Sequence, residues 1–486
     1  MSNKKFSRPS LALFTAIALS GGAFFAPSFA SAADVTIDST HPPQRNVPNP
    51  DDPSTPNSAA SVGTGSEDAS GNSLTVDRYQ EDTLSVFGGV ARGTGNADGN
   101  TVRIKGATTE IASVYGGAAW GTGHARENRV HFDAGTMSFA EWLVGGYVRR
   151  SGKARGNAVT IESAVHDVVG GEGSGEASGN TVDIRANAAA VTGGKSMGAA
   201  SNNRVTLGNI TATSVVGGDA VTAAEGNIVS LDGTTVTNDV VGGRGAAANG
   251  NTIHLRNTVV NGIVTGGAAS GGVGNTLAVY YRAGTSSIHD FKGIENLRLD
   301  VEDAPTDGTA HTLLKLTNVS GGSKNLTNMT LDFRRSGAAR KLQAGDSFTL
   351  LENASGKITV GEGVTMKGTD GIAHDCLFAI APDKAHPEKL RATVTKTGVG
   401  ETAKSPVETR AGLANFVNQG ADYLVGSGFT AAELSAENAS ADDAAESRAS
   451  AKDTQRRTVC GSKLPHAQAA PRATTACTAR MPDMTV

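Results

Sequence analysis

Asparagine recurs along the middle of the chain at a spacing that constrains the fold more than any other feature. Steps of 28, 28 and 29 residues are followed by steps of 23, 23, 24, 24 and 24 residues. Repeats of about 20 to 50 residues are typical of solenoid proteins, in which each repeat forms one coil. The spacing therefore predicts a stack of coils. The repeated residues are Asn72, Asn100, Asn128, Asn157, Asn180, Asn203, Asn227, Asn251 and Asn275.

Each asparagine opens a short segment of alternating apolar residues, such as Val182 and Ile184 after Asn180. A period of two places both apolar side chains on one face of a β-strand. In most repeats a second apolar position lies two residues before a glycine, as Val168 does before Gly170. Coils stacked about 4.8 Å apart bury such side chains continuously. The expected fold class is all-β: a single-stranded right-handed parallel β-helix or β-solenoid with a C-terminal β cap, a short α-helix and disordered termini.

Gly-Asn pairs such as Gly179-Asn180 precede most of these strands. They predict corners, because glycine accepts a positive φ and asparagine tolerates one. Two interpretations of the asparagines stay open. They are either turn formers only, or their side chains also hydrogen-bond from coil to coil, as side-chain ladders do in other stacked strands.

The N-terminus has the pattern of an export signal. Lys4, Lys5 and Arg8 precede an apolar run, and Ala30-Ser31-Ala32 offers a small-residue cleavage site. Residues 1–32 are therefore predicted to be a signal peptide that engages the Sec export machinery. Its removal takes away three positive charges and changes the formal net charge from −4 to −7. This mildly acidic mature chain has no basic stripe, which argues against nucleic acid as a partner.

Composition divides the rest of the exported chain. Residues 33–71 are rich in Pro, Ser, Asn and Thr and are expected to form a disordered leader. The solenoid repeats are expected to cover residues 72–282. From 283 to 400 the period breaks, but short alternating strands such as Phe348 to Leu351 continue. This segment is expected to be a β cap that covers the open end of the solenoid.

Residues 401–429 predict a helix. Ser405-Pro406-x-Glu408 has the form of a capping box, and Leu413, Phe416, Val417 and Leu424 fall on one helical face. A helix from Pro406 to Val425 would span about 30 Å, close to the hydrocarbon thickness of a bilayer. It is too polar to face lipid, because it also carries Glu408, Arg410, Asn415, Asn418, Gln419 and Asp422.

These segments, taken in order, resemble an autotransporter of Gram-negative bacteria (type V secretion). The resemblance covers the signal peptide, the β-helical passenger, an autochaperone-like cap around Leu342 to Leu351, and the linker helix from Glu408 to Asp422. In that family such a helix threads an outer-membrane β-barrel. The resemblance implies export and placement at the outer membrane or cell surface.

The tail departs from that family. Residues 430–486 contain no Phe, Tyr or Trp, whereas a membrane barrel needs at least about eight strands of roughly ten alternating residues. We expect a disordered tail that is a truncated or frameshifted barrel remnant. The outer membrane is then a partner only if a barrel is supplied, and the periplasm is the expected location if the barrel is truly absent.

Motifs for chemistry are weak, and no catalytic, cofactor-binding or metal-binding residue is assigned. Gly345-Asp346-Ser347 is interpreted as a β-turn, Gly193-Gly194-Lys195-Ser196 as a solenoid corner, and His166-Asp167 as a surface pair. Corresponding positions of adjacent coils carry no paired carboxylates of the kind that glycoside hydrolysis requires. Cys376, Cys460 and Cys477 receive no role.

Two functions from different classes remain. The first is a non-enzymatic, adhesin-like passenger that contacts a host surface protein, a glycan or another cell. The second is a carbohydrate-active β-helix enzyme. A non-functional truncated product retained in the periplasm is a third possibility. The longer coils carry Tyr115, Trp120, Trp142 and Tyr147, which either stack on sugars or cap the N-terminal end of the solenoid.

Overall fold

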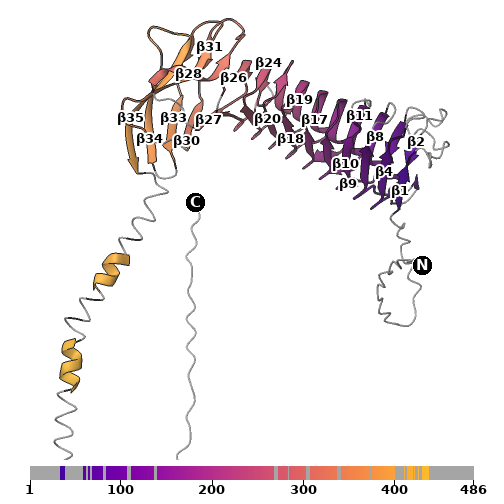
Figure 1. Ribbon diagram of the computed structural model, residues 1–486, viewed down its shortest axis with the longest axis horizontal. Helices are drawn as coiled ribbons and strands as arrows, with labels where there is room; N and C mark the ends of the chain where they lie inside the picture. The colour runs from indigo at the N-terminus through magenta and orange to yellow at the C-terminus, as the bar shows by residue number, and fades with distance from the viewer. Residues whose placement is uncertain are drawn as a thin grey trace, which may run out of the picture. The chain divides into compact units, whose positions relative to one another are not determined.

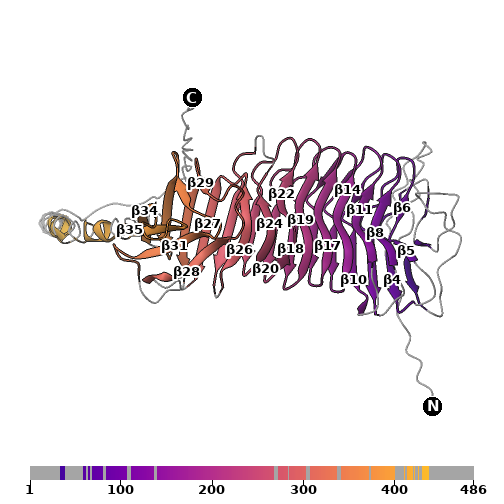
Figure 2. The same cartoon turned by 90° about the horizontal axis from the view of Figure 1, so that it is seen from above.

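The computed structural model is an all-β protein with 58% strand and 6% helix. The strands stack in chain order as a parallel β-solenoid of about nine turns (Figures 1 and 2). Further strands pair with the first and last of these turns. Contacts divide the chain into two units, Met1–Lys404 and Ser405–Val486. The structure describes residues 33–38, 59–61, 64–65, 68–79, 84–106, 111–135, 140–267, 272–282, 284–302, 307–336, 341–371, 374–399, 410, 413–419, 421, 425 and 429–436.

The first side of the solenoid is a parallel sheet of the strands that follow the asparagines. Its register keeps equivalent residues together, so Val182 lies opposite Val205, and Val205 lies opposite Val229. These strands are β1 (Asp34–Ile37), β4 (Ser73–Asp77), β7 (Thr101–Lys105), β10 (Arg129–Asp133), β13 (Ala158–Ile161), β16 (Thr181–Ile184), β18 (Arg204–Gly208), β20 (Ile228–Asp232), β23 (Thr252–Arg256), β25 (Thr276–Tyr281), β27 (Asn296–Glu302), β30 (Thr330–Ser336) and β33 (Thr365–Asp370).

The second side is a parallel sheet whose strands contain the glycine pairs in most of the regular coils. Val168 lies opposite Val191, and Val191 lies opposite Val215. These strands are β2 (Ala59–Ser61), β3 (Thr64–Gly65), β5 (Leu84–Phe87), β6 (Val90–Ala91), β8 (Ile111–Ala119), β11 (Ala140–Val148), β14 (Val165–Gly173), β17 (Ala188–Ser196), β19 (Thr211–Ala220), β21 (Thr235–Val236), β22 (Val240–Arg244), β24 (Val259–Thr265), β26 (Ser286–Lys292), β28 (Asp307–Leu316) and β31 (Ser347–Asn353).

A third, shorter side closes each coil. Isolated bridges from Glu176 through Ala199 and Ala223 to Ala247 continue this side. Its strands are β9 (Ala125–Arg126), β12 (Lys153–Arg155) and β15 (Glu176–Ser178), with β29 (Lys324–Leu326) and β32 (Ile358–Val360) paired further along the chain.

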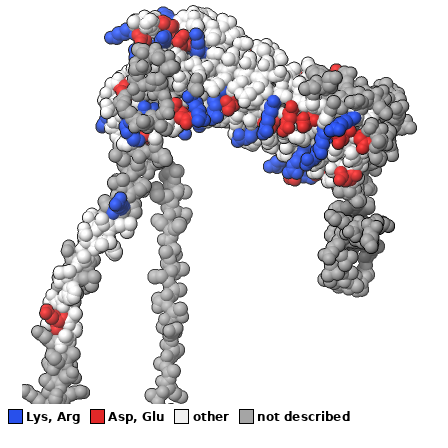
Figure 3. Space-filling view, in the orientation of Figure 1, with Lys and Arg blue, Asp and Glu red and all other residues white. Residues whose placement is uncertain are grey.

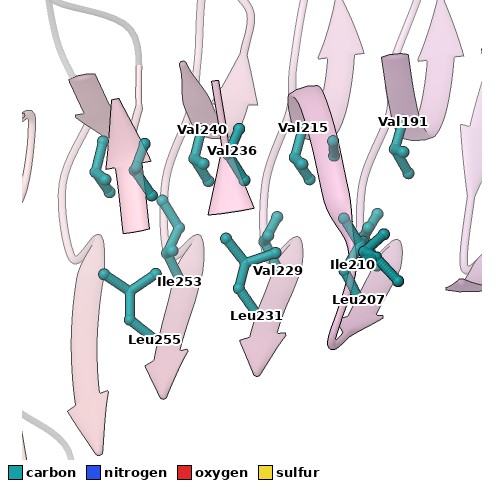
Figure 4. Close-up of a cluster of buried hydrophobic side chains, with 14 of the residues drawn as sticks. Val191, Leu207, Ile210, Val215, Val229, Leu231, Val236, Val240, Ile253 and Leu255 are labelled. Carbon is teal, nitrogen blue, oxygen red and sulfur yellow. The ribbon is translucent and has the colours of Figure 1, made fainter. Parts of the chain in front are cut away.

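The core is a narrow column between the first two sides. Figure 4 shows the apolar side chains of β18, β20 and β23 pointing toward those of the second side. Neighbouring residues cover Leu207, Val229 and Leu255 completely, and each has 0% of its surface exposed. Burial of one such side chain contributes about 1.5–3 kcal/mol. Because the coil is thin, that contribution depends on the coils above and below it.

The repeated asparagines form a hydrogen-bonded ladder inside the solenoid. The backbone N–H and the side-chain Nδ2 of Asn203 both donate to Oδ1 of Asn227, at 3.0 Å each. Asn203 Nδ2 also donates to the carbonyl of Ala177 at 2.9 Å, and Asn180 donates to Oδ1 of Asn203 in the same way. A buried amide is tolerated when it is fully hydrogen-bonded. The ladder interpretation is therefore confirmed.

The residue before each ladder asparagine forms the corner. Gly179 has a φ of 66°, and where the sequence lacks this glycine, Glu127 and Asn202 adopt φ values of 57° and 58°. None of the ladder asparagines is among the described residues with a positive φ. The turn is thus made by the preceding residue, which leaves the asparagine side chain free to point inward.

The glycine pairs make room for this ladder. A Cβ on Gly170 would lie 2.3 Å from the carbonyl oxygen of Gly193 and 3.0 Å from Cβ of Asn180. A Cβ on Gly171 would lie 2.6 Å from Nδ2 of Asn180. Only glycine fits at either position, because these distances are shorter than carbon contacts allow.

An alanine column completes the ladder, and the sequence analysis did not find it. Alanine occupies the third position before eight of the nine asparagines, and the carbonyl of each of seven accepts from an asparagine Nδ2 of the following coil. The small side chain is buried in every case. The invariant spacing of three residues is the signal that would have revealed it. These residues are Ala69, Ala97, Ala125, Ala154, Ala177, Ala200, Ala224 and Ala248.

The prediction that residues 33–71 are a disordered leader is wrong for part of this segment. The strand β1 pairs in parallel with β4, β2 with β5, and β3 with β6. The backbone N–H of Ala33 donates to Oδ1 of Asn72 at 3.2 Å. This coil has no asparagine of its own and a much longer connection, so the period did not reveal it.

The predicted end of the solenoid near Arg282 is also wrong, because parallel pairing continues through β27, β30 and β33. The asparagine period ends at Asn275 because the next ladder position carries a glutamate. The backbone N–H of Asn275 donates to Oε2 of Glu295 at 2.8 Å, so a carboxylate replaces the next amide. Nδ2 of Asn275 has no partner among the described residues.

Two antiparallel strands close the stack, as expected of a cap. They are β34 (His374–Pro382) and β35 (Lys389–Val399), which pair with each other, with β33 and with β31. Buried ion pairs lie in this part of the molecule. Lys324 Nζ contacts Asp290 Oδ1 at 2.6 Å, and Arg335 Nε contacts Asp370 Oδ1 at 3.0 Å. Burial lowers the pKa of Lys324, and the hydrogen bond to Asp290 opposes that shift.

Residues 413–419 and 429–436 are helical. The first helix lies within the predicted linker helix. The second described helical stretch, 429–436, extends past residue 430, at which the disordered tail was expected to start. Ser435 Oγ donates to the carbonyl of Ala431 at 2.8 Å, four residues earlier, which is the spacing of a helical turn.

Replacing one ladder asparagine should destabilise the protein. Asn203→Ala removes hydrogen bonds to three coils and leaves the Asn180 N–H and the Ala177 carbonyl buried without that partner. We expect the free energy of unfolding to fall by roughly 2–4 kcal/mol, measured by urea denaturation followed by circular dichroism. The control is the exposed neighbour Arg204→Ala, for which we expect less than about 0.5 kcal/mol. Equal effects of the two substitutions would contradict the ladder.

The glycine pair offers a second test. Gly170→Ala places a methyl group against the next coil and should cost roughly 2 kcal/mol or more. Gly208→Ala has no atom within 4 Å of the added Cβ and should change stability by less than about 1 kcal/mol. The melting temperatures of the two variants are compared with that of the parent protein. A Gly170→Ala protein as stable as the parent would show that Gly170 does not lie in close contact with the next coil.

Candidate functional site

Three of the four aromatic residues singled out in the sequence form one cluster. Tyr115 on β8 stacks on Phe87 with ring centroids 4.9 Å apart, and its ring lies 5.6 Å from that of Tyr147 on β11. Trp120, just after β8, lies 5.6 Å from Tyr147. Tyr115 follows the inward-facing Val114, so its side chain points to the outer face of the strand. We call Tyr115, Trp120, Trp142 and Tyr147 the aromatic face.

Trp142 lies apart from this cluster and contacts charged residues. Nζ of Lys195 is 5.4 Å from the Trp142 ring centroid, and the same ammonium contacts Glu172 at 3.1 Å. The guanidinium of Arg149 lies 5.6 Å from the Trp120 ring. The indole N–H groups of Trp120 and Trp142 have no hydrogen-bond partner among the described residues. Both nitrogens are shielded from solvent, and a buried donor of this kind can be satisfied by an ordered water.

The aromatic face does not close the end of the solenoid. The coil formed by β1, β2 and β3 lies between it and the N-terminal end, because β2 pairs with β5 and β5 pairs with β8. A depression of about 240 Å³ lies beside it, with Tyr147, Arg149 and Lys195 in its lining. The structure thus places the aromatic face on the outside of the longer coils.

A larger groove lies elsewhere, and the sequence analysis did not find it. It has a volume of about 900 Å³ and crosses the outer face of β25, β27, β30 and β33, with residues of β34 at one edge. In register, Tyr280 lies opposite Asp300, and Asp300 lies opposite Arg334. Figure 3 shows basic and acidic residues side by side over this part of the solenoid. We call it the Tyr280 groove, lined by Arg256, Tyr280, Arg298, Asp300, Arg334 and Lys367, among others.

Tyr280 is held firmly at the edge of this groove. Arg298 Nη2 donates to the Tyr280 hydroxyl, which lies 3.2 Å from Nδ1 of His254. The guanidinium groups of Arg256 and Arg298 lie 5.7 and 5.5 Å from the ring centroid, within the range of cation–π attraction. Burial lowers the pKa of His254, and the charges of Arg298 and Arg204 act in the same direction. A neutral imidazole can accept a hydrogen bond from the tyrosine hydroxyl.

Opposite charges two residues apart line the groove floor. Arg298 Nε contacts Asp300 Oδ2 at 2.7 Å, and Arg334 Nη2 contacts Asp332 Oδ2 at 2.7 Å. The sequence analysis found no paired carboxylates because it compared regular coils, and these strands lie where the period is broken. The alternation of Arg-x-Asp and Asp-x-Arg in neighbouring strands is the signal that would have pointed to the groove.

The weak motifs have structural roles. Nδ1 of His166 lies 2.9 Å from Asp167 on a half-exposed surface, as predicted. Gly345 has a φ of 98° and precedes β31, which begins at Ser347. The segment Gly193 to Ser196 lies within β17 (Ala188–Ser196), so its interpretation as a solenoid corner is wrong. Within the part of the chain that the structure describes, no group of three or more His, Cys, Asp or Glu residues is placed to hold a metal ion.

Cys376 is buried in the cap, where burial raises the pKa of its thiol to about 11. A thiol with such a pKa stays protonated near neutral pH and is a poor nucleophile. Cys460 and Cys477 lie outside the described residues.

The linker residues named in the sequence analysis are only partly described. Arg410, Phe416 and Asn418 are exposed, Phe416 with 73% of its surface accessible. Glu408 and Asp422 lie outside the described residues, as does the whole predicted signal peptide. Among the described helices, none has the length and apolar character needed to cross a membrane.

Comparison with known proteins adds no family. No protein-family model matches the chain, no curated protein matches it, and no solved structure matches it. The fold and the two outer surfaces, the aromatic face and the Tyr280 groove, are therefore the features that indicate the function.

Proposed function

We propose that the chain is a non-enzymatic, adhesin-like passenger of an autotransporter. It is exported through the Sec machinery, is placed at the cell surface by an outer-membrane barrel, and contacts a glycan or protein of a host or of another cell. The β-solenoid fold supports this proposal, together with the resemblance of residues 408–422 to an autotransporter linker helix. An export signal at residues 1–32 belongs to the same proposal.

The observation that carries the proposal is the register of the coils. Because equivalent residues lie opposite one another along the first side, outward side chains fall into straight columns. One such column runs through Thr160, Asp183, Thr206, Ser230 and His254, so it presents polar side chains at a regular spacing to a long partner. The aromatic face and the Tyr280 groove each interrupt such columns with ring surfaces, which are favourable contact groups because they combine large apolar area with polar edges.

A carbohydrate-active enzyme is the second candidate, because the Tyr280 groove brings together Asp300 and Asp332 from adjacent strands. Glycoside hydrolysis uses two carboxyl groups, one of which must donate a proton. Here each carboxylate is already paired with an arginine at 2.7 Å. Carboxyl groups that are each engaged by an arginine suit a binding surface better than an acid catalyst, which must present its oxygen to the bond that is cleaved.

The two candidates predict different results on glycans. We expect the mature chain to bind a subset of a glycan array and to release no reducing ends from the glycans it binds. Trp120→Ala with Trp142→Ala should reduce that binding roughly tenfold if the aromatic face is a contact surface. Trp120→Phe with Trp142→Phe keeps the rings and serves as the matched control.

Release of reducing ends by the unmodified chain would contradict a non-enzymatic role. An array profile unchanged in the double alanine variant, with its circular dichroism spectrum intact, would remove the aromatic face from the proposal.

A further inference from the structure

The Tyr280 groove has a charge opposite to that of the protein as a whole. The full chain has a formal net charge of −4. The groove is lined by six Lys or Arg residues and four Asp or Glu residues. Arg335 is buried and paired with Asp370, so the other nine charged side chains carry a formal charge of +1. Lys367 is exposed, and no ion pair involves it among the described residues. Complementary charge steers partners and selects among them, so this groove suits an anionic ligand.

Tyr280 adds an apolar platform at the edge of these charges. Its ring is half-buried and is held in place by contacts with Arg298, Arg256 and His254. A smaller cavity of about 310 Å³ lies on the other side, and it shares Tyr280 and Arg256 with the groove. The ring therefore stands between two hollows, accessible to a ligand that extends across several strands. A fixed ring loses little conformational entropy when a ligand binds.

The groove carries both positive and negative side chains, and this mixture indicates which class of anionic ligand it can bind. Asp300 and Asp332 line the same floor as Arg298 and Arg334. These carboxylates accept hydrogen bonds from the hydroxyl groups of a sugar chain, which the phosphodiester backbone of DNA does not offer between its ends. A sugar chain with many hydroxyls and some carboxylate or sulfate groups matches this pattern. Single-stranded nucleic acid matches it less well, because it needs a groove of uniformly positive charge.

We propose that the Tyr280 groove binds an acidic oligosaccharide, with one pyranose ring packed on Tyr280 and the acidic groups placed toward Arg256, Arg298 and Lys367. This proposal rests on the proposed adhesin-like function and names the class of glycan and the place where it binds. Arginine is well suited to hold a carboxylate or sulfate, because its planar donors can form two parallel hydrogen bonds.

Isothermal titration calorimetry on the mature chain tests the proposal with four probes of equal length. They are a heparin hexasaccharide, which carries sulfate and carboxylate, hexagalacturonate, which carries carboxylate alone, maltohexaose, which is neutral, and a thymidine hexanucleotide. We expect binding of at least one acidic saccharide and none of maltohexaose. The affinity should fall with added salt, because salt screens exposed charges. The two acidic probes distinguish sulfate from carboxylate as the recognised group.

Four variants locate the site. Tyr280→Ala should weaken binding roughly tenfold, whereas Tyr280→Phe should stay within about threefold because it keeps the ring. Lys367→Gln should weaken binding and reduce its dependence on salt. Lys105→Gln is the control, because Lys105 lies at the end of β7 on the same side of the solenoid, far along the stack from the groove. Tyr280 is only half-buried, and a melting curve for each variant checks that it folds.

Several outcomes would overturn the proposal. These are equal binding of maltohexaose, tighter binding of the hexanucleotide, or unchanged affinity in folded Tyr280→Ala and Lys367→Gln proteins. If glycan binding is instead lost in the Trp120 and Trp142 variants alone, the groove is not the site, but the adhesin-like function stands. If the unmodified chain binds no acidic probe but binds other glycans on the array, the charge argument fails and the proposed function again stands.

Discussion

The buried asparagine ladder is the interaction on which the rest of the structure depends. From Asn100 to Asn251, each ladder amide donates both of its N–H bonds and accepts two others, as Asn203 does, so neighbouring coils are joined at a fixed point of every turn. A slip of one residue in any strand would reverse its inward and outward side chains and would leave buried amides unpaired. The glycine pairs and the alanine column follow from this ladder, because an amide inside so thin a coil leaves no room for larger side chains.

The same constraint organises the outer surfaces. With the register fixed, outward residues fall into columns. The position of a residue within its repeat decides which column it joins, and the residue type decides what the column presents at that coil. Where the ladder ends at Asn275 and Glu295 takes over, the strands become longer and carry alternating charges, and the Tyr280 groove lies on them. The buried pairs of Lys324 with Asp290 and of Arg335 with Asp370 lie in this same region. A buried pair is costly to break, so the Arg335–Asp370 pair holds β30 and β33 together beneath the groove, whereas the Lys324–Asp290 pair joins β29 to β26.

Much of the fold was predictable because it repeats. The asparagine period and the two apolar positions predicted the coils, their inward residues and their corners, and the structure confirms them. The first coil was not predicted because Ala33 occupies the ladder position in place of an asparagine. The strands after Arg282 were not predicted as coils because Glu295 occupies that position. Tyr115, Trp120 and Tyr147 were predicted to matter by their place in longer coils. Tyr280 was not, because its contacts come from the neighbouring strands β23 and β27, and the charge alternation that marks the groove lies where the period is broken.

Disulfide formation between introduced cysteines tests the ladder's register most directly. In a background with Cys376, Cys460 and Cys477 replaced by alanine, one protein carries Asp183→Cys with Thr206→Cys, which are partners across β16 and β18. A second carries Asp183→Cys with Arg204→Cys, displaced by two residues. In-register Cα atoms of neighbouring strands are about 4.8 Å apart, which a disulfide spans, whereas the displaced pair is about 8 Å apart, which it does not. The account predicts rapid disulfide formation in the first protein only. Equal formation in both, or formation in the second alone, would show that the asparagines do not set the register.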